Sequence, residues 1–186
     1  MRHVKVLAHA PVDDAMDVFE KLGDFARYPD LVEPVRTVEV EQVSADVVIT
    51  TWAVLFRKGL LHWSEKDFYD RPNLTIGFEQ EDGDFDTMTG SWQVIPVDGG
   101  CDVVFESTFD FGVSSIESIV EPIAARQLKD NVELMLIGLF GDGVTFTPAT
   151  AAEEPQQRRY AVLDYSGRPD LVGAPGYASG YGTGTR

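Results

Sequence analysis

The chain has 186 residues, of which 44% are hydrophobic, and this is enough for one domain with a sizeable core. Its 31 acidic and 15 basic residues give a net charge of −16, so we expect neither nucleic acid nor an anionic membrane as a partner. No apolar stretch is long enough to span a membrane, and residues 2–10 (RHVKVLAHA) do not resemble a secretory signal. These features favour a soluble, cytoplasmic protein.

Cysteine and histidine are scarce in this chain. Cys101 is the single cysteine and cannot form an internal disulfide. The three histidines, His3, His9 and His62, do not have the spacing of zinc ligands. The glycine-rich segment GYGTG (180–184) lies near the C-terminal end rather than between a strand and a helix. We therefore expect no metal, nucleotide or other cofactor.

The first elements are a strand and a helix. Residues 3–10 (HVKVLAHA) have the pattern of a strand, and Pro11 then precedes a helical pattern with acidic residues in its first turn. The apolar stripe of this helix is predicted to be Val12, Ala15, Met16 and Phe19. Residues 23–34 (GDFARYPDLVEP) contain a glycine and two prolines, which predicts a connector with at most one helical turn.

The hydrophobic period then changes to two residues. Turn signals separate six strand-like runs, at residues 35–43, 46–58, 60–70, 74–80, 85–97 and 101–112. From about residue 116, apolar residues recur at helical spacing up to Gly141, with Pro122 as an expected bend. The order of elements predicts an α+β fold in which a curved, seven-stranded antiparallel sheet wraps around a long C-terminal helix. Such a sheet leaves a ligand cavity between itself and the helix.

The composition changes after residue 141. Residues 142–186 are rich in glycine, proline, alanine, serine and threonine, and their apolar content is confined to YAVLDY (160–165). We therefore predict one ligand-binding domain at 1–141 and a flexible tail at 142–186.

Two segments carry a family resemblance. Residues 83–112 (GDFDTMTGSWQVIPVDGGCDVVFESTFDFG) combine Gly-x-Phe, a small residue before x-Trp, a proline, a glycine turn and Phe-x-Phe. Residues 10–32 (APVDDAMDVFEKLGDFARYPDLV) form the second segment. With the order of elements over 2–141, they resemble the helix-grip (START-like) superfamily of polyketide cyclase/dehydrases and coenzyme Q-binding chaperones. The resemblance implies the helix-grip fold and a cavity for a polyketide or another apolar molecule.

The run at 60–70 supplies the candidate catalytic residues. Alternation places Trp63, Glu65 and Asp67 on one face, and Trp63 resembles a pocket tryptophan of the tetracenomycin-type cyclases. Two carboxylates in one cavity raise the pKa of one of them toward the range of a general acid or base. The alternative is that both are solvated rim residues. Arg57 is a third candidate, because a cation can orient a carbonyl or enolate oxygen. The alternative, a solvated hairpin tip, is the simpler explanation of this residue.

Asp67 also stands where those cyclases carry an arginine, so their mechanism does not transfer directly to this chain. The expected substrate-binding residues are aromatic or methionine: Tyr28, Trp52, Trp63, Met88, Trp92, Phe105, Phe109 and Met135. Ordinary core packing is the alternative for each of them. Gly90 lacks a side chain between Met88 and Trp92, which we interpret as room for a ligand.

Three functional hypotheses follow. The first is a polyketide aromatase/cyclase-like protein that folds a poly-β-ketone and promotes its cyclisation or dehydration, with an acyl carrier protein as a partner that presents the chain. The second is a non-catalytic carrier or chaperone of a quinone, lipid or polyketide. The third is an interaction module in which YAVLDY pairs with the sheet edge of a partner or of a second copy in a homodimer.

Overall fold

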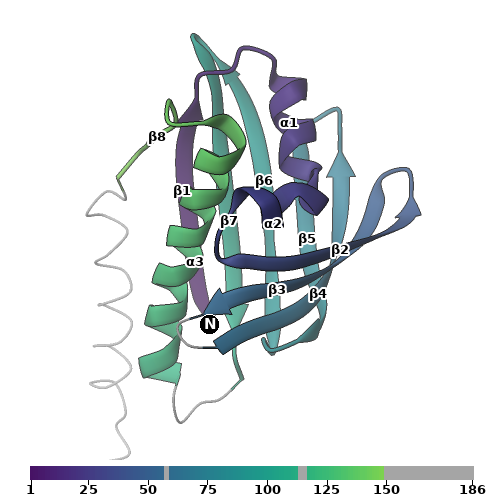
Figure 1. Cartoon of the computed structure of the whole chain (residues 1–186), viewed down its shortest axis with the longest axis vertical. Helices are drawn as coiled ribbons and strands as arrows, with labels where there is room; N and C mark the ends of the chain where they lie inside the picture. Colours follow the sequence, from purple (N-terminus) through teal and green to yellow (C-terminus); the bar gives the residue numbers. More distant parts are fainter. Residues whose placement is uncertain (57–58, 113–116, 149–186) are drawn as a thin grey trace, which may run out of the picture. The chain divides into compact units, whose positions relative to one another are not determined.

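The computed structural model describes residues 1–56, 59–112 and 117–148. One antiparallel sheet dominates it, with strand order β2-β3-β4-β5-β6-β7-β1-β8 (Figure 1). The strands are β1 (Arg2–Ala10), β2 (Val35–Ser44), β3 (Val47–Phe56), β4 (Gly59–Asp70), β5 (Thr75–Gly83), β6 (Thr87–Val97), β7 (Gly100–Asp110) and β8 (Thr145–Phe146). The predicted α+β helix-grip architecture is confirmed: a curved antiparallel sheet and a long C-terminal helix.

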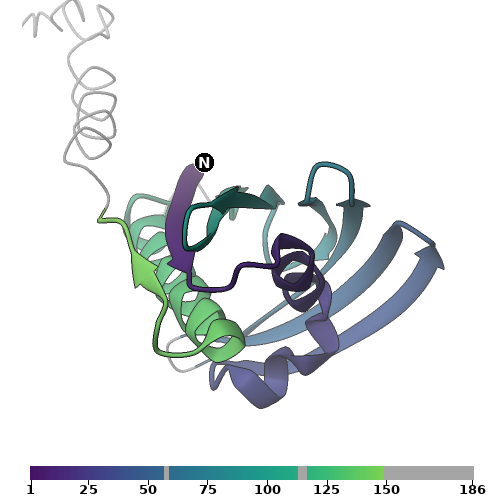
Figure 2. The ribbon, with the colours of Figure 1, turned by 90° about the horizontal axis from the view of Figure 1, so that it is seen from above.

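The helices lie on the concave side of the sheet. They are α1 (Ala15–Gly23), η1 (Phe25–Arg27), α2 (Tyr28–Leu31) and α3 (Glu117–Phe140). Figure 2 shows the strands curving around α1, α2 and α3. α3 ends where predicted, at Gly141, whose φ of +85° suits glycine and whose N–H donates to the Ile137 carbonyl over 2.8 Å. None of the helices in the described part of the chain is long and apolar enough to cross a membrane.

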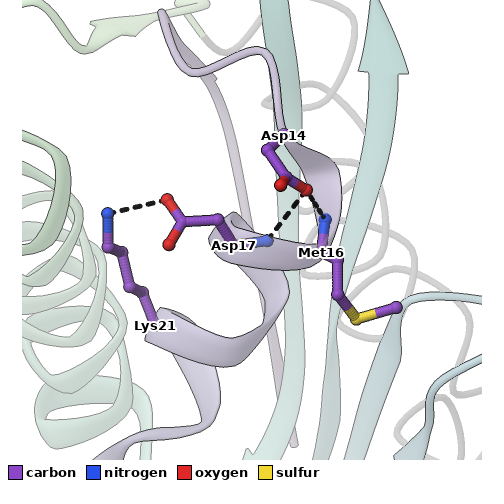
Figure 3. A network of polar contacts seen from close by, with 4 residues as sticks. All are labelled: Asp14, Met16, Asp17 and Lys21. Atoms are coloured by element: carbon purple, nitrogen blue, oxygen red, sulfur yellow. Dashed lines mark hydrogen bonds and ion pairs between the residues drawn. The ribbon is translucent and has the colours of Figure 1, made fainter.

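α1 begins one residue after a capping aspartate. The Asp14 carboxylate accepts hydrogen bonds from the backbone N–H groups of Met16 and Asp17, and Lys21 forms an ion pair with Asp17 one turn earlier (Figure 3). The predicted apolar stripe is wrong at Met16, whose side chain is 41% exposed. Phe19 is buried as predicted, and Val18 and Leu22 complete the buried face of α1.

The sheet has eight strands rather than the predicted seven. β8 pairs with β1 through Ala8 opposite Phe146 and His9 opposite Thr145, and the Thr147 N–H donates to the Leu7 carbonyl over 2.9 Å. The compact unit spans Met1–Thr147, so it continues past residue 141, where the composition had placed the boundary. A two-residue strand is too short to produce a period. The rest of the predicted tail, residues 149–186 with YAVLDY, lies outside the described residues.

β7 shows how the sheet builds the interior. From Cys101 onward its burial alternates, and Val103, Phe105, Ser107 and Phe109 point inward. On the helical side, α3 contributes Ala124, Val132, Met135 and Leu136 to the same core. Long aromatic side chains from both sides meet in this space, and the remaining volume forms the cavity described next.

Candidate functional site

A hollow of about 540 Å³, part of it open to solvent, lies between the sheet and α3. Its wall is aromatic and aliphatic except for a few polar side chains, among them Glu65, Ser107 and Asn131. A second hollow of about 400 Å³ adjoins the first and extends toward Phe85 and Phe109. The two hollows share the lining residues Val54, Trp63, Met88, Leu128 and Asn131.

The eight predicted substrate-binding residues all border this space. Seven of them line the first hollow: Tyr28, Trp52, Trp63, Met88, Trp92, Phe105 and Met135. Phe109 lines the second hollow. Most are also buried members of the hydrophobic core, so the same side chains pack the core and form the cavity wall. Their role in ligand binding stays a prediction.

A pair of stacked indoles lines the first hollow. Trp52 on β3 and Trp63 on β4 are register partners, and their rings lie 5.8 Å apart with an interplanar angle of 5°. Phe25 and Tyr28 meet the Trp52 ring edge-on from the connector between α1 and β2. Aromatic side chains on a cavity wall suit a ligand with aromatic or planar parts.

Glu65 brings a carboxyl group to the cavity wall. It is 6% exposed, and its Oε2 accepts a hydrogen bond from Trp63 Nε1 over 2.8 Å. Burial raises the pKa of Glu65 well above its usual range, and the nearby Asp67 carboxyl raises it further. The hydrogen bond from Trp63 opposes this rise without cancelling it.

Asp67 lies behind the wall rather than on it. It is 1% exposed and does not line either hollow. Its Oδ2 accepts a hydrogen bond from Thr50 Oγ1 over 2.7 Å, and Thr50 in turn accepts one from Trp52 Nε1 over 2.8 Å. Burial raises the pKa of Asp67 to about 7, although the Thr50 hydroxyl opposes the shift. The solvated-rim alternative for this carboxyl pair is therefore wrong.

This pair sits among too few hydrogen-bond donors. Asp67 Oδ1 is buried without a partner among the described residues, and so is Oε1 of Gln80, the β5 residue opposite Glu65. A buried carboxylate without donors is costly, whereas a protonated carboxyl group brings its own donor. The local chemistry therefore favours at least one bound proton in this cluster at neutral pH.

Two tyrosines form hydrogen bonds with the C-terminal end of α1. Tyr28 donates its hydroxyl proton to the Leu22 carbonyl, and Tyr69 donates to the Gly23 carbonyl, each over 2.8 Å. Burial raises the pKa of both phenols above the usual value. They are neutral hydrogen-bond donors to the backbone: Tyr69 holds the end of α1 against strand β4, and Tyr28 connects it to α2.

The remaining sequence predictions for the site concern Arg57, Gly90 and His62. Arg57, the third catalytic candidate, belongs to the residues that the structure does not describe. Gly90 does not open room for a ligand, because a Cβ there would lie 2.3 Å from Phe78 Cζ and from the Glu106 carbonyl oxygen. The Phe78 ring occupies that space and stacks on Phe105. His62 is exposed on the outer face, as its alternation predicts.

The sequence did not single out Asn131 as a site residue. This α3 residue is 4% exposed and lines both hollows, and its Oδ1 accepts a hydrogen bond from Gln127 Nε2 over 3.1 Å. A signal was present, because Asn131 lies at helical spacing from Leu128 and Met135 within the predicted apolar stripe.

Clusters of side chains suited to a metal ion are absent from the described residues.

Comparison with known proteins places this geometry in a family. The family model described as polyketide cyclase/dehydrase and lipid transport matches residues 9–136. A crystal structure of a protein from Thermus thermophilus superposes with a TM-score of 0.69 at 22% identity, covering 74% of this chain and 94% of that one.

Two further structures share the fold. The Zhui aromatase/cyclase from Streptomyces sp. R1128 gives a TM-score of 0.64 at 18% identity, covering 74% of this chain and 93% of that one. A START superfamily protein from Mycobacterium smegmatis gives 0.61 at 13% identity, covering 75% and 95%. No curated protein matches the chain in sequence.

Proposed function

The chain belongs to the polyketide cyclase/dehydrase and lipid transport family, and we propose that it binds a planar, mostly apolar ketone of the polyketide class and transfers protons on it with the Glu65 carboxyl group. The observation that carries the proposal is the place of Glu65. Among the described residues, it supplies the one carboxyl group on the wall of a largely apolar cavity. A carboxyl group in such a setting is a candidate general acid or base.

The proposed chemistry begins at a carbon next to a carbonyl group. The Glu65 carboxylate removes a proton from this carbon, and the resulting enolate carbon attacks a second carbonyl carbon of the same chain, so that one C–C bond forms. The alkoxide oxygen takes up the proton. In a dehydration, the Glu65 carboxylate removes a second proton from the carbon next to the carbonyl group and, as the neutral carboxyl group, gives this proton to the departing hydroxyl, which leaves as water while a C=C bond forms. A raised pKa makes the Glu65 carboxylate a stronger base, although fewer molecules are ionised at neutral pH.

The cavity contributes by folding the chain. Holding the carbon nucleophile near its carbonyl replaces a bimolecular step by an intramolecular one, which is worth at most about 7 to 11 kcal/mol. We propose that the stacked Trp52 and Trp63 rings provide the flat surface for this. Asp67, which does not reach the hollow, acts through its charge and its proton on Glu65. A role for Arg57 in orienting an oxygen, an acyl carrier protein partner and a homodimer remain proposals.

A non-catalytic carrier is the second candidate. The family description includes lipid transport, and most of the wall is apolar, which suffices for retaining a quinone, lipid or polyketide. The two candidates differ in whether the bound ligand exchanges protons with Glu65.

Deuterium exchange separates these candidates. The probe is 1-tetralone, a bicyclic ketone whose C2 protons exchange with D2O through the enol, followed by proton NMR. We expect the protein to accelerate the loss of the C2 signal. Glu65→Gln keeps the size and shape of the side chain but removes the base, so it should bind 1-tetralone without accelerating exchange.

Glu79→Gln is the matched control, because Glu79 is exposed on the adjacent strand β5. It should exchange like the unmodified protein. Binding of 1-tetralone without any acceleration by the unmodified protein supports the carrier and rejects proton transfer. Equal acceleration by Glu65→Gln rejects Glu65 as the base.

A further inference from the structure

A buried amide faces the cavity from the helical side. Asn131 on α3 lines both hollows, whereas Glu65 lines the first hollow from strand β4 of the sheet. The Asn131 side chain is only 4% exposed, in a stretch of α3 whose neighbours Val132 and Met135 are apolar and buried. A leucine at this position would fit the apolar stripe, so the polar group calls for a physical reason.

The neighbouring glutamine orients this amide. Gln127 precedes Asn131 by one helical turn and donates from Nε2 to Asn131 Oδ1 over 3.1 Å. With the oxygen occupied in this way, the other end of the amide is the Nδ2 group with its two N–H donors. Nδ2 has no hydrogen-bond partner among the described residues, and it is not one of the atoms that protein encloses completely. It therefore opens onto the hollows that Asn131 lines.

An unpartnered hydrogen-bond donor in an apolar cavity is unfavourable unless a ligand atom accepts its hydrogen bond. Burying an amide without a hydrogen bond costs free energy, and a ligand oxygen that accepts the bond removes that cost. A purely hydrocarbon ligand would leave the Asn131 N–H groups without water and without a partner. The site is thus built to prefer a ligand with an acceptor at this point.

We infer that Asn131 Nδ2 donates a hydrogen bond to a carbonyl oxygen of the ligand and makes the cavity selective for ketones over hydrocarbons of the same shape. Asn131 borders both hollows, so the carbonyl group lies near their junction, with apolar parts of the ligand on either side. In an enolisation, the same donor stabilises the negative charge that develops on this oxygen. The inference rests on the proposed ketone-binding function and names how the ketone is recognised.

Three matched probes test this selectivity. They are 1-tetralone, 1-tetralol and tetralin, which share two fused rings and differ in carrying a carbonyl, a hydroxyl or neither. Binding is measured by the change in tryptophan fluorescence, since Trp52, Trp63 and Trp92 all line the first hollow. We expect 1-tetralone to bind about two- to tenfold more tightly than tetralin, the range of one neutral hydrogen bond.

The variants separate hydrogen bonding from folding. Asn131→Leu replaces the amide by an apolar side chain of similar size, so it should fold, bind tetralin at least as tightly and lose the ketone preference. Asn131→Asp replaces the donor by an acceptor and should reverse the preference. Gln127→Met frees the amide to rotate and should reduce the preference without abolishing it. Asp130→Leu changes an exposed residue of the same helix and should leave the preference unchanged.

Each outcome decides one point. If tetralin binds but Asn131→Leu keeps the full ketone preference, the role of Asn131 is refuted while the ligand cavity stands. If 1-tetralol binds more tightly than 1-tetralone in the unmodified protein and loses this advantage in Asn131→Leu, the amide presents its oxygen and the donor assignment is wrong. If none of the three probes binds, the proposed function itself fails.

Discussion

Replacing Asp67 by asparagine should change how the stability of the fold depends on pH. Asparagine keeps the size of the side chain and an oxygen that can accept the Thr50 hydrogen bond, but it cannot ionise. Burial raises the pKa of Asp67 from an ordinary 3.8 to about 7. Between these two pH values, the folded protein keeps a proton that the unfolded chain has released.

The sign follows from proton linkage. Because the folded state binds more protons in this window, the free energy of unfolding falls as pH rises. The full difference of about 3 pKa units corresponds to about 4 kcal/mol, of which about 3 kcal/mol is lost between pH 5 and pH 8. The raised pKa of Glu65 acts in the same direction. The Glu106 carboxylate, whose pKa the hydrogen bond from Lys5 lowers, acts in the opposite direction and below this window.

Urea unfolding followed by tryptophan fluorescence at pH 5, 6, 7 and 8 measures this free energy. The unmodified protein should lose stability with rising pH, and Asp67→Asn should lose about 3 kcal/mol less over the same range. Asp98→Asn, at an exposed position, is the control and should follow the unmodified protein. Parallel curves for Asp67→Asn and the unmodified protein would show that Asp67 is ionised in the fold at pH 5, contrary to our reasoning.

Three further predictions follow from the packing and the chemistry of the cavity. Gly90→Ala should destabilise the fold by about 1 to 3 kcal/mol, as overpacking does. Gly77→Ala on the next strand should not, because nothing lies within 4 Å of its new Cβ. Equal changes in melting temperature for the two variants would contradict this prediction. Trp92→Ala should weaken the binding of 1-tetralone and lower the free energy of unfolding by no more than about 3 kcal/mol. A larger loss of stability with unchanged binding would show that Trp92 serves only the packing of the hydrophobic core. The exchange rate of 1-tetralone on the protein should rise with pH as Glu65 ionises, because its raised pKa delays formation of the carboxylate, and a flat profile would exclude a carboxylate base.

The fold was predictable because its elements are long and periodic. Strands of nine to twelve residues repeat the alternation many times, and α3 carries several helical turns of apolar residues before Gly141. Where the pattern is short, prediction failed. β8 has two residues and shows no period, and the exposure of Met16 depends on how α1 is oriented over the sheet, which its own sequence does not specify.

The site was predictable where strand alternation decides it. Glu65 and Asp67 share the inward face of β4 as expected, but alternation could not show that only Glu65 reaches the hollow. That difference depends on neighbouring side chains, since Thr50 and Trp52 cover Asp67 through their hydrogen bonds. Asn131 was not predicted, because a single polar residue in an apolar stripe indicates a binding site only when the cavity beside it is known.

The proposed chemistry depends most on Glu65 being a carboxyl group that keeps its proton in the free protein and touches the ligand. Infrared difference spectra between the unmodified protein and Glu65→Gln at pH 6 test this directly, because the protonated carboxyl group has a carbonyl stretching band that the ionised form lacks. We expect this band in the free protein, where burial and Asp67 hold the pKa of Glu65 high. Addition of 1-tetralone should shift it. A spectrum with only ionised carboxylate bands, or a carboxyl band that the ligand leaves unchanged, would contradict the central claim.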